Sequence, residues 1–176
     1  MPVNFARDFF AGFRSDMKIR LAASHCARGE FDEAIARYTE AIRLNPGAAA
    51  AYCNRGLAHC EIGEFEQAIA DCAEAIRLDP NMASAYVNRG LAHYYEKAFD
   101  EAIADCAEAI RLNPDDAAAY TNRGLSHTAK REFGEAIADF EEALRIEPGN
   151  DETKEWLENA RRGSQMAARE CAWEET

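Results

Sequence analysis

The chain has 176 residues, 48% of them apolar, and a formal net charge of −12 from 32 acidic and 20 basic side chains. Nucleic acids and anionic lipids are bound by clustered Lys and Arg, so this balance argues against both as partners. No stretch approaches about 18 apolar residues and the first residues hold no signal-peptide core, so we expect a cytoplasmic chain without membrane insertion.

Residues 1–14 hold four phenylalanines that lie close to one helical stripe: Phe5, Phe9, Phe10 and Phe13. We predict an N-terminal amphipathic segment here, with a helix over residues 3–13. So much apolar surface needs cover, and two explanations stay open. The segment either caps the chain's own core or docks onto a second copy of the chain.

A 34-residue repeat follows this segment. The motif AYCNRGLAH at residue 51 returns as AYVNRGLAH at 85 and AYTNRGLSH at 119, and residues 49–82 and 83–116 are identical at 22 of 34 positions. A fixed period of this length indicates a stack of one supersecondary unit. We divide the array into four repeats, at 15–48, 49–82, 83–116 and 117–150.

Each repeat has the pattern of two amphipathic helices. In the second repeat they run from about Ala51 to Glu61 and from Phe65 to Leu78, and a short polar turn with Gly63 separates them. A proline follows each second helix and disfavours helical geometry in the residue before it. After the last repeat, residues 151–163 are predicted to form a capping helix that ends near Gly163. The tail, 164–176, has no assignment.

These residues resemble the tetratricopeptide repeat over about 15–150. The first repeat departs from the pattern, with Lys18 and Ala22 in place of Tyr and Gly, but keeps Ala34, Ala41 and Pro46. The matching residues in the other repeats are Tyr52, Gly56, Ala68, Ala75 and Pro80; Tyr86, Gly90, Ala102, Ala109 and Pro114; and Tyr120, Gly124, Ala136, Ala143 and Pro148. The resemblance implies an all-α protein, an α-solenoid of antiparallel helix-turn-helix repeats wound as a right-handed superhelix. It also implies a scaffold for protein–protein interaction whose first helices line a concave groove.

Small residues and thiols are expected in the core. Gly and Ala allow the helices of a repeat to approach closely, while Cys72 and Cys106 share a position with Tyr38 and Phe140 and fill core volume as small hydrophobes. The six cysteines lack the paired spacing of a metal site and are expected to be reduced.

Histidine recurs at the same position of every repeat, at His25, His59, His93 and His127. Successive repeats are separated by about one helix-packing distance, about 10 Å, so these rings cannot meet on one zinc ion. Packed, hydrogen-bonded histidines are the better interpretation. The chain also lacks the common catalytic motifs, and we expect no enzyme, no cofactor and no metal.

An ion pair inside each repeat is predicted from residues that occur together. Arg55, Arg89 and Arg123 share one position, and Asp71, Asp105 and Asp139 share another, whereas the first repeat lacks both residues. Arg55 would face Arg37 if it paired with the preceding repeat. Pairing within the repeat is therefore favoured.

Asparagine carries the functional hypothesis. Its amide can pair with the N–H and C=O of an extended peptide, and a spacing near 10 Å matches about three extended residues. The alternative, in which each Asn bonds to a neighbouring helix, stays open. The predicted peptide-binding residues are Asn54, Leu57, Asn88, Leu91, Tyr94, Tyr95, Asn122 and Leu125.

The groove around these residues is expected to be neutral and apolar, with Cys53, Cys60, Val87 and Thr121 as further members. Related repeat proteins that hold the carboxylates of chaperone tails use Lys and Arg, which this groove lacks. The sequence thus predicts a non-enzymatic adaptor or scaffold for a protein or peptide ligand. The alternative is a structural protein that assembles with copies of itself through its Phe-rich segment.

Overall fold

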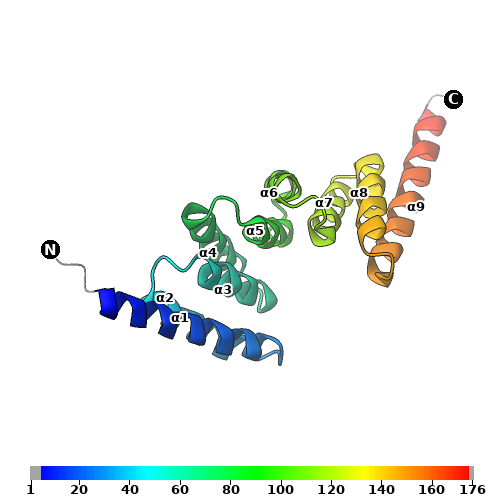
Figure 1. Ribbon diagram of the computed structural model, residues 1–176. Helices are drawn as coiled ribbons and strands as arrows, with labels where there is room; N and C mark the ends of the chain where they lie inside the picture. Colours follow the sequence, from blue (N-terminus) through cyan, green and yellow to red (C-terminus); the bar gives the residue numbers. More distant parts are fainter. Residues whose placement is uncertain (1–4, 175–176) are drawn as a thin grey trace. The chain divides into compact units, whose positions relative to one another are not determined.

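The computed structural model describes residues 5–174, with side chains described at 12 and 14–169. This part of the chain is built from α-helices in helix-turn-helix order and contains no strand, as the sequence predicts (Figure 1). The helices are α1 Phe5–Cys26, α2 Phe31–Leu44, α3 Ala49–Glu61, α4 Phe65–Leu78, α5 Ala83–Tyr95, α6 Phe99–Leu112, α7 Ala117–Ala129, α8 Phe133–Ile146 and α9 Asp151–Glu174.

The helices divide into two compact units, each described by itself. The N-terminal unit extends to Ala92 and the C-terminal unit begins at His93, so the boundary falls within α5. In the N-terminal unit α1 packs on α2, and α3 packs on both α2 and α4. In the C-terminal unit α7 packs on α6 and α8, and α9 packs on α8.

Proline ends the second helix of each repeat. Asn45, Asp79, Asn113 and Glu147 all leave helical geometry, and the first three share φ near −139° and ψ near 92°. Each precedes a proline, whose ring excludes the helical region for the residue before it. Each second helix therefore ends before its proline, as the sequence predicts.

The turn between the two helices of a repeat always includes one residue with positive φ. Gly29 and Gly63 have φ of 74° and 79°, and the equivalent Lys97 and Arg131 have φ of 62° and 63°. Only glycine enters this region without a steric penalty. The turns of the third and fourth repeats are therefore strained.

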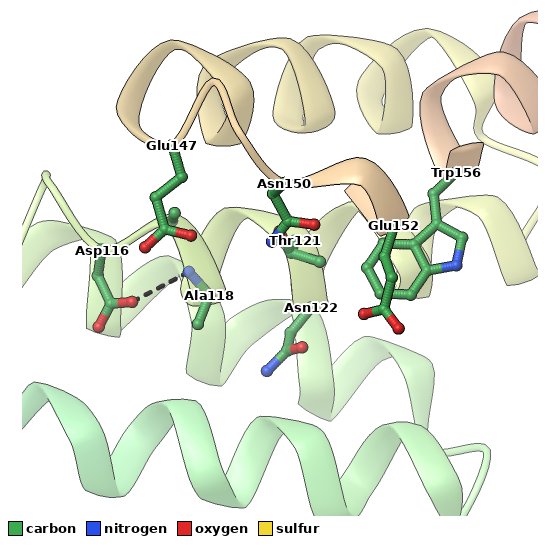
Figure 2. A pocket seen from close by; sticks show the side chains of 9 residues that line it. Asp116, Ala118, Thr121, Asn122, Glu147, Asn150, Glu152 and Trp156 are labelled. Carbon is green, nitrogen blue, oxygen red and sulfur yellow. Dashed lines mark hydrogen bonds between the residues drawn. The ribbon is translucent and has the colours of Figure 1, made fainter. Parts of the chain in front are cut away.

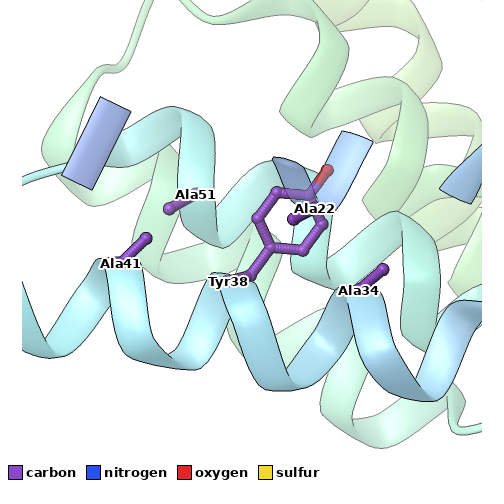
Figure 3. Close-up of a cluster of buried hydrophobic side chains, with 5 residues drawn as sticks. All are labelled: Ala22, Ala34, Tyr38, Ala41 and Ala51. Atoms are coloured by element: carbon purple, nitrogen blue, oxygen red, sulfur yellow. The ribbon is translucent and has the colours of Figure 1, made fainter. Parts of the chain in front are cut away.

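Alanine surrounds one large ring in the core of the first repeat. Tyr38 projects from α2 among Ala22, Ala34, Ala41 and Ala51, and all five residues are at most 1% exposed (Figure 3). Small side chains on both neighbouring helices leave the space that this ring fills. Their short reach also lets α1, α2 and α3 approach closely.

The glycine of each first helix marks a close contact with the second helix. A Cβ on Gly56 would lie 2.7 Å from the Cys72 Sγ and 3.1 Å from the carbonyl oxygen of Ala68. A Cβ on Gly124 would lie 2.7 Å from a ring carbon of Phe140. Because Cys72 and Phe140 are fully buried, neither can move aside easily. The predicted role of glycine and of the core cysteine is confirmed at these positions.

The last helix is longer than the sequence predicts. α9 continues through Gly163 to Glu174, so the expected end near Gly163 is wrong. A Cβ at Gly163 would lie 2.5 Å from a ring carbon of Phe133. Gly163 is therefore a contact residue that admits the Phe133 ring, and it does not stop the helix.

The first helix includes part of the predicted N-terminal segment. α1 runs without interruption from Phe5 to Cys26, so residues 5–13 continue directly into the first helix of repeat one. The side chains of the four phenylalanines lie outside the described part of the chain. Their predicted packing stays a prediction.

Candidate functional site

Largely buried ion pairs connect the two helices of a repeat. In the second repeat Arg55 donates to Asp71 through Nε at 2.7 Å and Nη2 at 2.6 Å. In the fourth repeat Arg123 makes the same two bonds to Asp139, at 2.9 and 2.7 Å. Hydrogen bonds to these aspartates raise the pKa of both arginines. The predicted pairing within the repeat is confirmed at these two places.

The third pair, Arg89 with Asp105, stays a prediction. Each arginine also lies over the ring of the tyrosine three residues before it, with the guanidinium 5.7 Å from the ring centre. These stacks involve Arg55 with Tyr52, Arg89 with Tyr86, and Arg123 with Tyr120. Arg55 and Arg123 are thus held on two sides, by an aspartate and by a tyrosine ring, and serve the fold.

Three of the four histidines are packed and hydrogen-bonded, as predicted. These three bond through Nδ1 to a glutamate five residues later: His25 to Glu30 and His59 to Glu64 at 2.6 Å, and His127 to Glu132 at 2.7 Å. The third repeat has Ala98 at the glutamate position, and there the His93 Nε2 lies 3.8 Å from the Asp105 carboxylate. No cluster of residues suited to a metal ion occurs within the described side chains.

The asparagine amides of the first helices differ in their bonding. The Asn88 Nδ2 donates to the backbone carbonyl of Cys53 at 3.3 Å, so this residue follows the alternative interpretation in part. Asn54 and Asn122 are half-buried, and neither amide forms a hydrogen bond with any described residue. Neither amide is among the fully buried groups that lack a partner, so both are accessible to solvent or to a ligand. Two of the three predicted amides are therefore open to a ligand.

An apolar pocket lies beside Leu57 in the N-terminal unit. It has a volume of about 350 Å³, and Leu57 is 37% exposed. Its lining residues come from α1, α2, α3 and the turn after α1: Cys26, Ala27, Phe31, Leu57, Ala58 and Glu61. A pocket of this character suits an apolar side chain of a ligand. Leu91, the equivalent of Leu57, is half-buried.

The three predicted apolar contact residues of the C-terminal unit differ in how far they are exposed to solvent. Tyr95 is 52% exposed, whereas Tyr94 packs against Phe99 at 5.9 Å between ring centres. Leu125 packs against the core cluster that contains Phe140 and is only partly exposed. Tyr95 is the most accessible of the three to a ligand.

Three residues expected in the groove are buried. Cys53, Cys60 and Val87 are 2%, 7% and 8% exposed. Cys53 and Cys60 contact residues of the next first helix, since the Cys53 Sγ lies 3.6 Å from the Ser84 hydroxyl and the Cys60 Sγ 3.9 Å from the Asn88 carbonyl oxygen. Burial also raises the pKa of the Cys60 thiol to about 12. Their assignment as groove-lining residues is wrong, since helical position alone does not separate an exposed side chain from one at a helix interface.

A second pocket surrounds Asn122 in the C-terminal unit and is acidic. Its volume is about 210 Å³. Its lining residues are Asp116, Ala117, Ala118, Thr121, Asn122, Glu147, Asn150, Glu152 and Trp156. Figure 2 shows Asp116 and Glu147 at one end, Glu152 and Trp156 at the other, and Thr121 and Asn122 of α7 between them.

The expectation of a neutral groove is therefore wrong around Asn122. The acidic side chains lie at helix ends and in connections: Asp116 precedes α7, Glu147 follows α8 and Glu152 lies in the first turn of α9. From the sequence alone such positions are predicted only to be boundaries between helices.

The helix pairs, the glycine contacts and the ion pairs inside the repeats define a helix-turn-helix repeat protein. Models of the tetratricopeptide repeat match residues 19–83 and residues 83–116 and 117–150. The chain therefore belongs to the tetratricopeptide repeat family, as the resemblance predicts.

Solved structures with the same fold are similar to the chain over most of its length. The first TPR domain of human RPAP3 is 28% identical, with a TM-score of 0.67 over 72% of this chain and 98% of that domain. The first TPR of Spaghetti (RPAP3), bound to the HSP90 peptide SRMEEVD, is 31% identical, with a TM-score of 0.63 over 68% and 93%.

A third structure, the TPR protein TTC0263 of Thermus thermophilus, is 20% identical, with a TM-score of 0.75 over 83% and 80%, and supports the fold alone. The comparison with curated proteins finds no match. Over the described residues, no helix has both the length and the apolar character needed to cross a membrane.

Proposed function

We propose that the protein is a non-enzymatic adaptor, located in the cytoplasm, that binds a peptide segment of a partner protein along its first helices. The observation that carries this proposal is the state of Asn54 and Asn122. Their amides are half-buried and have no hydrogen-bond partner among the described residues. The Spaghetti (RPAP3) structure with its HSP90 peptide supports a peptide as the ligand class.

The amide group explains why a peptide of any sequence can be held. Each Asn offers one acceptor and two donors, which match the N–H and C=O groups of an extended backbone. The Asn88 Nδ2 donates to the carbonyl oxygen and the Sγ of Cys53, and its Oδ1 acceptor is kept for the ligand. Each such bond contributes about 0.5–1.5 kcal/mol, so backbone recognition supplies general affinity and other groups supply selectivity.

Selectivity is assigned to the exposed apolar side chains. Leu57 opens onto the apolar pocket of the N-terminal unit, and Tyr95 presents half of its surface in the C-terminal unit. Leu91, Tyr94 and Leu125 complete the proposed contact set, with smaller accessible areas.

Capture of the partner by the immobilised full chain tests this proposal. The decisive variant is Asn54→Ala with Asn122→Ala, because Asn88→Ala would also break the bond to Cys53. The matched control is Gln67→Ala with Asn159→Ala, which removes two exposed amides from α4 and α9.

The loss of the hydrogen bonds from two asparagines to the bound peptide should weaken partner binding by about tenfold or more. The control variant should capture as much partner as the wild type, and the circular dichroism spectra of all three proteins should be the same. The same amount of partner retained by both double variants would refute the proposal.

A second candidate function is self-association through α1. Met17 and Leu21 are 59% and 47% exposed, although the positions equivalent to Met17 in later repeats, Ala51, Ala85 and Ala119, are fully buried. In those repeats a preceding repeat covers this face, whereas on α1 no described residue covers Met17 and Leu21 to the same extent. A second copy of the chain would cover Met17 and Leu21.

Light scattering of the full chain distinguishes this candidate. Met17→Gln with Leu21→Gln leaves the helix intact and removes the apolar face, so oligomers present in the wild type should dissociate. A wild type that is monomeric at high concentration would eliminate the candidate.

A further inference from the structure

The apolar pocket beside Leu57 is lined by Phe31, the first residue of α2, and by two small residues that lie next to it. These are Cys26, the last residue of α1, and Ala27, in the turn that follows. The Cys26 Sγ lies 4.0 Å from the hydroxyl of the buried Tyr38, so this side chain is turned toward the core. Neither small residue is large enough to cover the Phe31 ring.

The third repeat shows how the chain covers the equivalent ring. There the equivalent of Phe31 is Phe99, and tyrosines stand at the positions of the two small residues. The ring centres of Tyr94 and Phe99 are 5.9 Å apart, and those of Tyr94 and Tyr95 are 5.5 Å apart with a T-shaped arrangement. These distances are favourable for aromatic pairs. The first repeat has the same phenylalanine without the tyrosines, so its pocket lies where an aromatic partner of Phe31 is missing.

Glu61 adds a carboxylate to this otherwise apolar lining. Its side chain is exposed and forms no hydrogen bond or ion pair within the described part of the chain. A carboxylate accepts hydrogen bonds and repels negative charge. The complementary ligand group therefore has an apolar body with a hydrogen-bond donor at its edge. Tyrosine has this character, since its ring is apolar and its hydroxyl is polar.

Size and position suit one side chain of the proposed peptide. The volume of about 350 Å³ lies at the lower end of the range of about 300–1,000 Å³ for ligand pockets. Asn54, Leu57 and Glu61 follow one another at helical spacing along one face of α3. The helical rise separates Asn54 from Glu61 by about 10.5 Å, or about three residues of extended chain. A peptide backbone held by the Asn54 amide therefore passes within reach of the pocket.

We propose that this pocket receives a tyrosine side chain of the partner peptide, with its ring against Phe31 and Leu57 and its hydroxyl donating to Glu61. This inference rests on the proposed function and specifies one side chain of its ligand. Burial of the ring supplies apolar binding energy, and the hydrogen bond distinguishes tyrosine from phenylalanine. The partner should carry this tyrosine within about three residues of the residue that Asn54 holds.

Four capped tripeptides test the pocket without knowledge of the partner: acetyl-Ala-X-Ala-amide, in which X is Tyr, Phe, Leu or Arg. Each is titrated into the ¹⁵N-labelled full chain, and the backbone N–H signals of Phe31 and Leu57 are followed, with Gly134 of α8 as the reference outside the pocket. The tyrosine peptide should shift the two pocket signals alone. It should bind about threefold more tightly than the phenylalanine peptide and about fivefold or more tightly than the leucine and arginine peptides.

Ala27→Tyr places the tyrosine of the third repeat beside Phe31 and should fill the pocket. Ala27 is exposed, so the fold should stay intact, as circular dichroism would show, while the tyrosine peptide no longer shifts the pocket signals. Ala36→Tyr adds the same ring to an exposed position of α2 outside the pocket and is the matched control. It should bind the tyrosine peptide as the wild type does.

Glu61→Ala tests the contact with the hydroxyl. It should remove the preference for the tyrosine peptide over the phenylalanine peptide, and Glu66→Ala, at an exposed position of α4, should retain it. Equal affinities of the two aromatic peptides for the wild type, or a preference that survives Glu61→Ala, would contradict the assignment of tyrosine.

Three further results would overturn the inference. They are unchanged signals of Phe31 and Leu57 with every peptide, tightest binding by the leucine or arginine peptide, and shifts that persist in Ala27→Tyr. Partner capture that depends on Asn54 and Asn122 would survive each of these failures, so the two proposals fail separately.

Discussion

Gly124→Ala should destabilise the fourth repeat, although alanine is the better helix former. The added Cβ would lie 2.7 Å from one ring carbon of Phe140 and 3.0 Å from two others. Overpacking of this kind costs about 1–3 kcal/mol, and the gain in helix propensity offsets about 0.5–1 kcal/mol of it. The expected net loss in the free energy of unfolding is about 0.5–2 kcal/mol.

Gly134→Ala is the matched control because a Cβ at Gly134, in α8, would meet nothing within 4 Å. It should stabilise the chain by up to about 0.5–1 kcal/mol, so the difference between the two variants isolates the contact with Phe140. Urea unfolding followed by circular dichroism measures both.

Phe140→Leu supplies the second arm of the test. It removes the ring atoms that Gly124→Ala would strike, so the alanine should cost less in that background, with a coupling energy of about 0.5–2 kcal/mol. The reasoning would be refuted if Gly124→Ala were as stable as Gly134→Ala, or if its cost were the same with Leu at position 140.

Three further predictions concern the turns, the thiols and the charged surface. Lys97→Gly should raise the free energy of unfolding by about 0.5–1 kcal/mol, as measured by chemical denaturation. Lys97 has φ of 62°, and this left-handed conformation costs an L-residue roughly 1–2 kcal/mol. Glycine avoids that cost but loses more conformational entropy on folding, which offsets part of the gain. Cys106 is fully buried and burial raises the pKa of its thiol to about 12, so it should resist a disulfide reagent until the chain unfolds, as peptide mapping would show. Hydrogen bonds from Arg28 and His25 lower the pKa of Glu30 from 4.5 to about 2, so its stabilising effect should be complete above about pH 4.5 and be lost as the pH falls toward 2. Arg28→Met should move the carboxyl titration of Glu30, followed by NMR, back toward 4.5.

Much of the fold could be predicted because equivalent positions of the repeats can be compared within one sequence. The recurrence of Arg55 and Asp71 together, and their joint absence from the first repeat, identified a contact that helical periodicity alone would not specify. Gly56 could be placed at a close helix contact for a similar reason, since an unfavourable residue that returns at one position needs compensation elsewhere. The proline after each second helix allowed the end of that helix to be predicted.

The rest of the site depends on contacts that no repeat position reports. Gly163 was interpreted as the end of the last helix because glycine disfavours helices. In the structure the Phe133 ring occupies the space that a Cβ at this position would take. The acidic pocket lies where α9 follows the last repeat. This junction occurs once in the described part of the chain, so a comparison between repeats could not reveal the pocket. Asn88 donates a hydrogen bond to the backbone carbonyl of Cys53, whereas the side chains of Asn54 and Asn122 form no such bond. Three asparagines at equivalent positions of the repeats therefore differ in their hydrogen bonding.

The affinity of the captured partner for the Asn54→Ala and Asn122→Ala double variant tests the central claim most directly. Calorimetric titration of the partner into wild type and double variant should show binding that is weaker by about tenfold or more in the variant, with unchanged unfolding curves. Equal dissociation constants for the two proteins would contradict the claim that these amides hold a peptide.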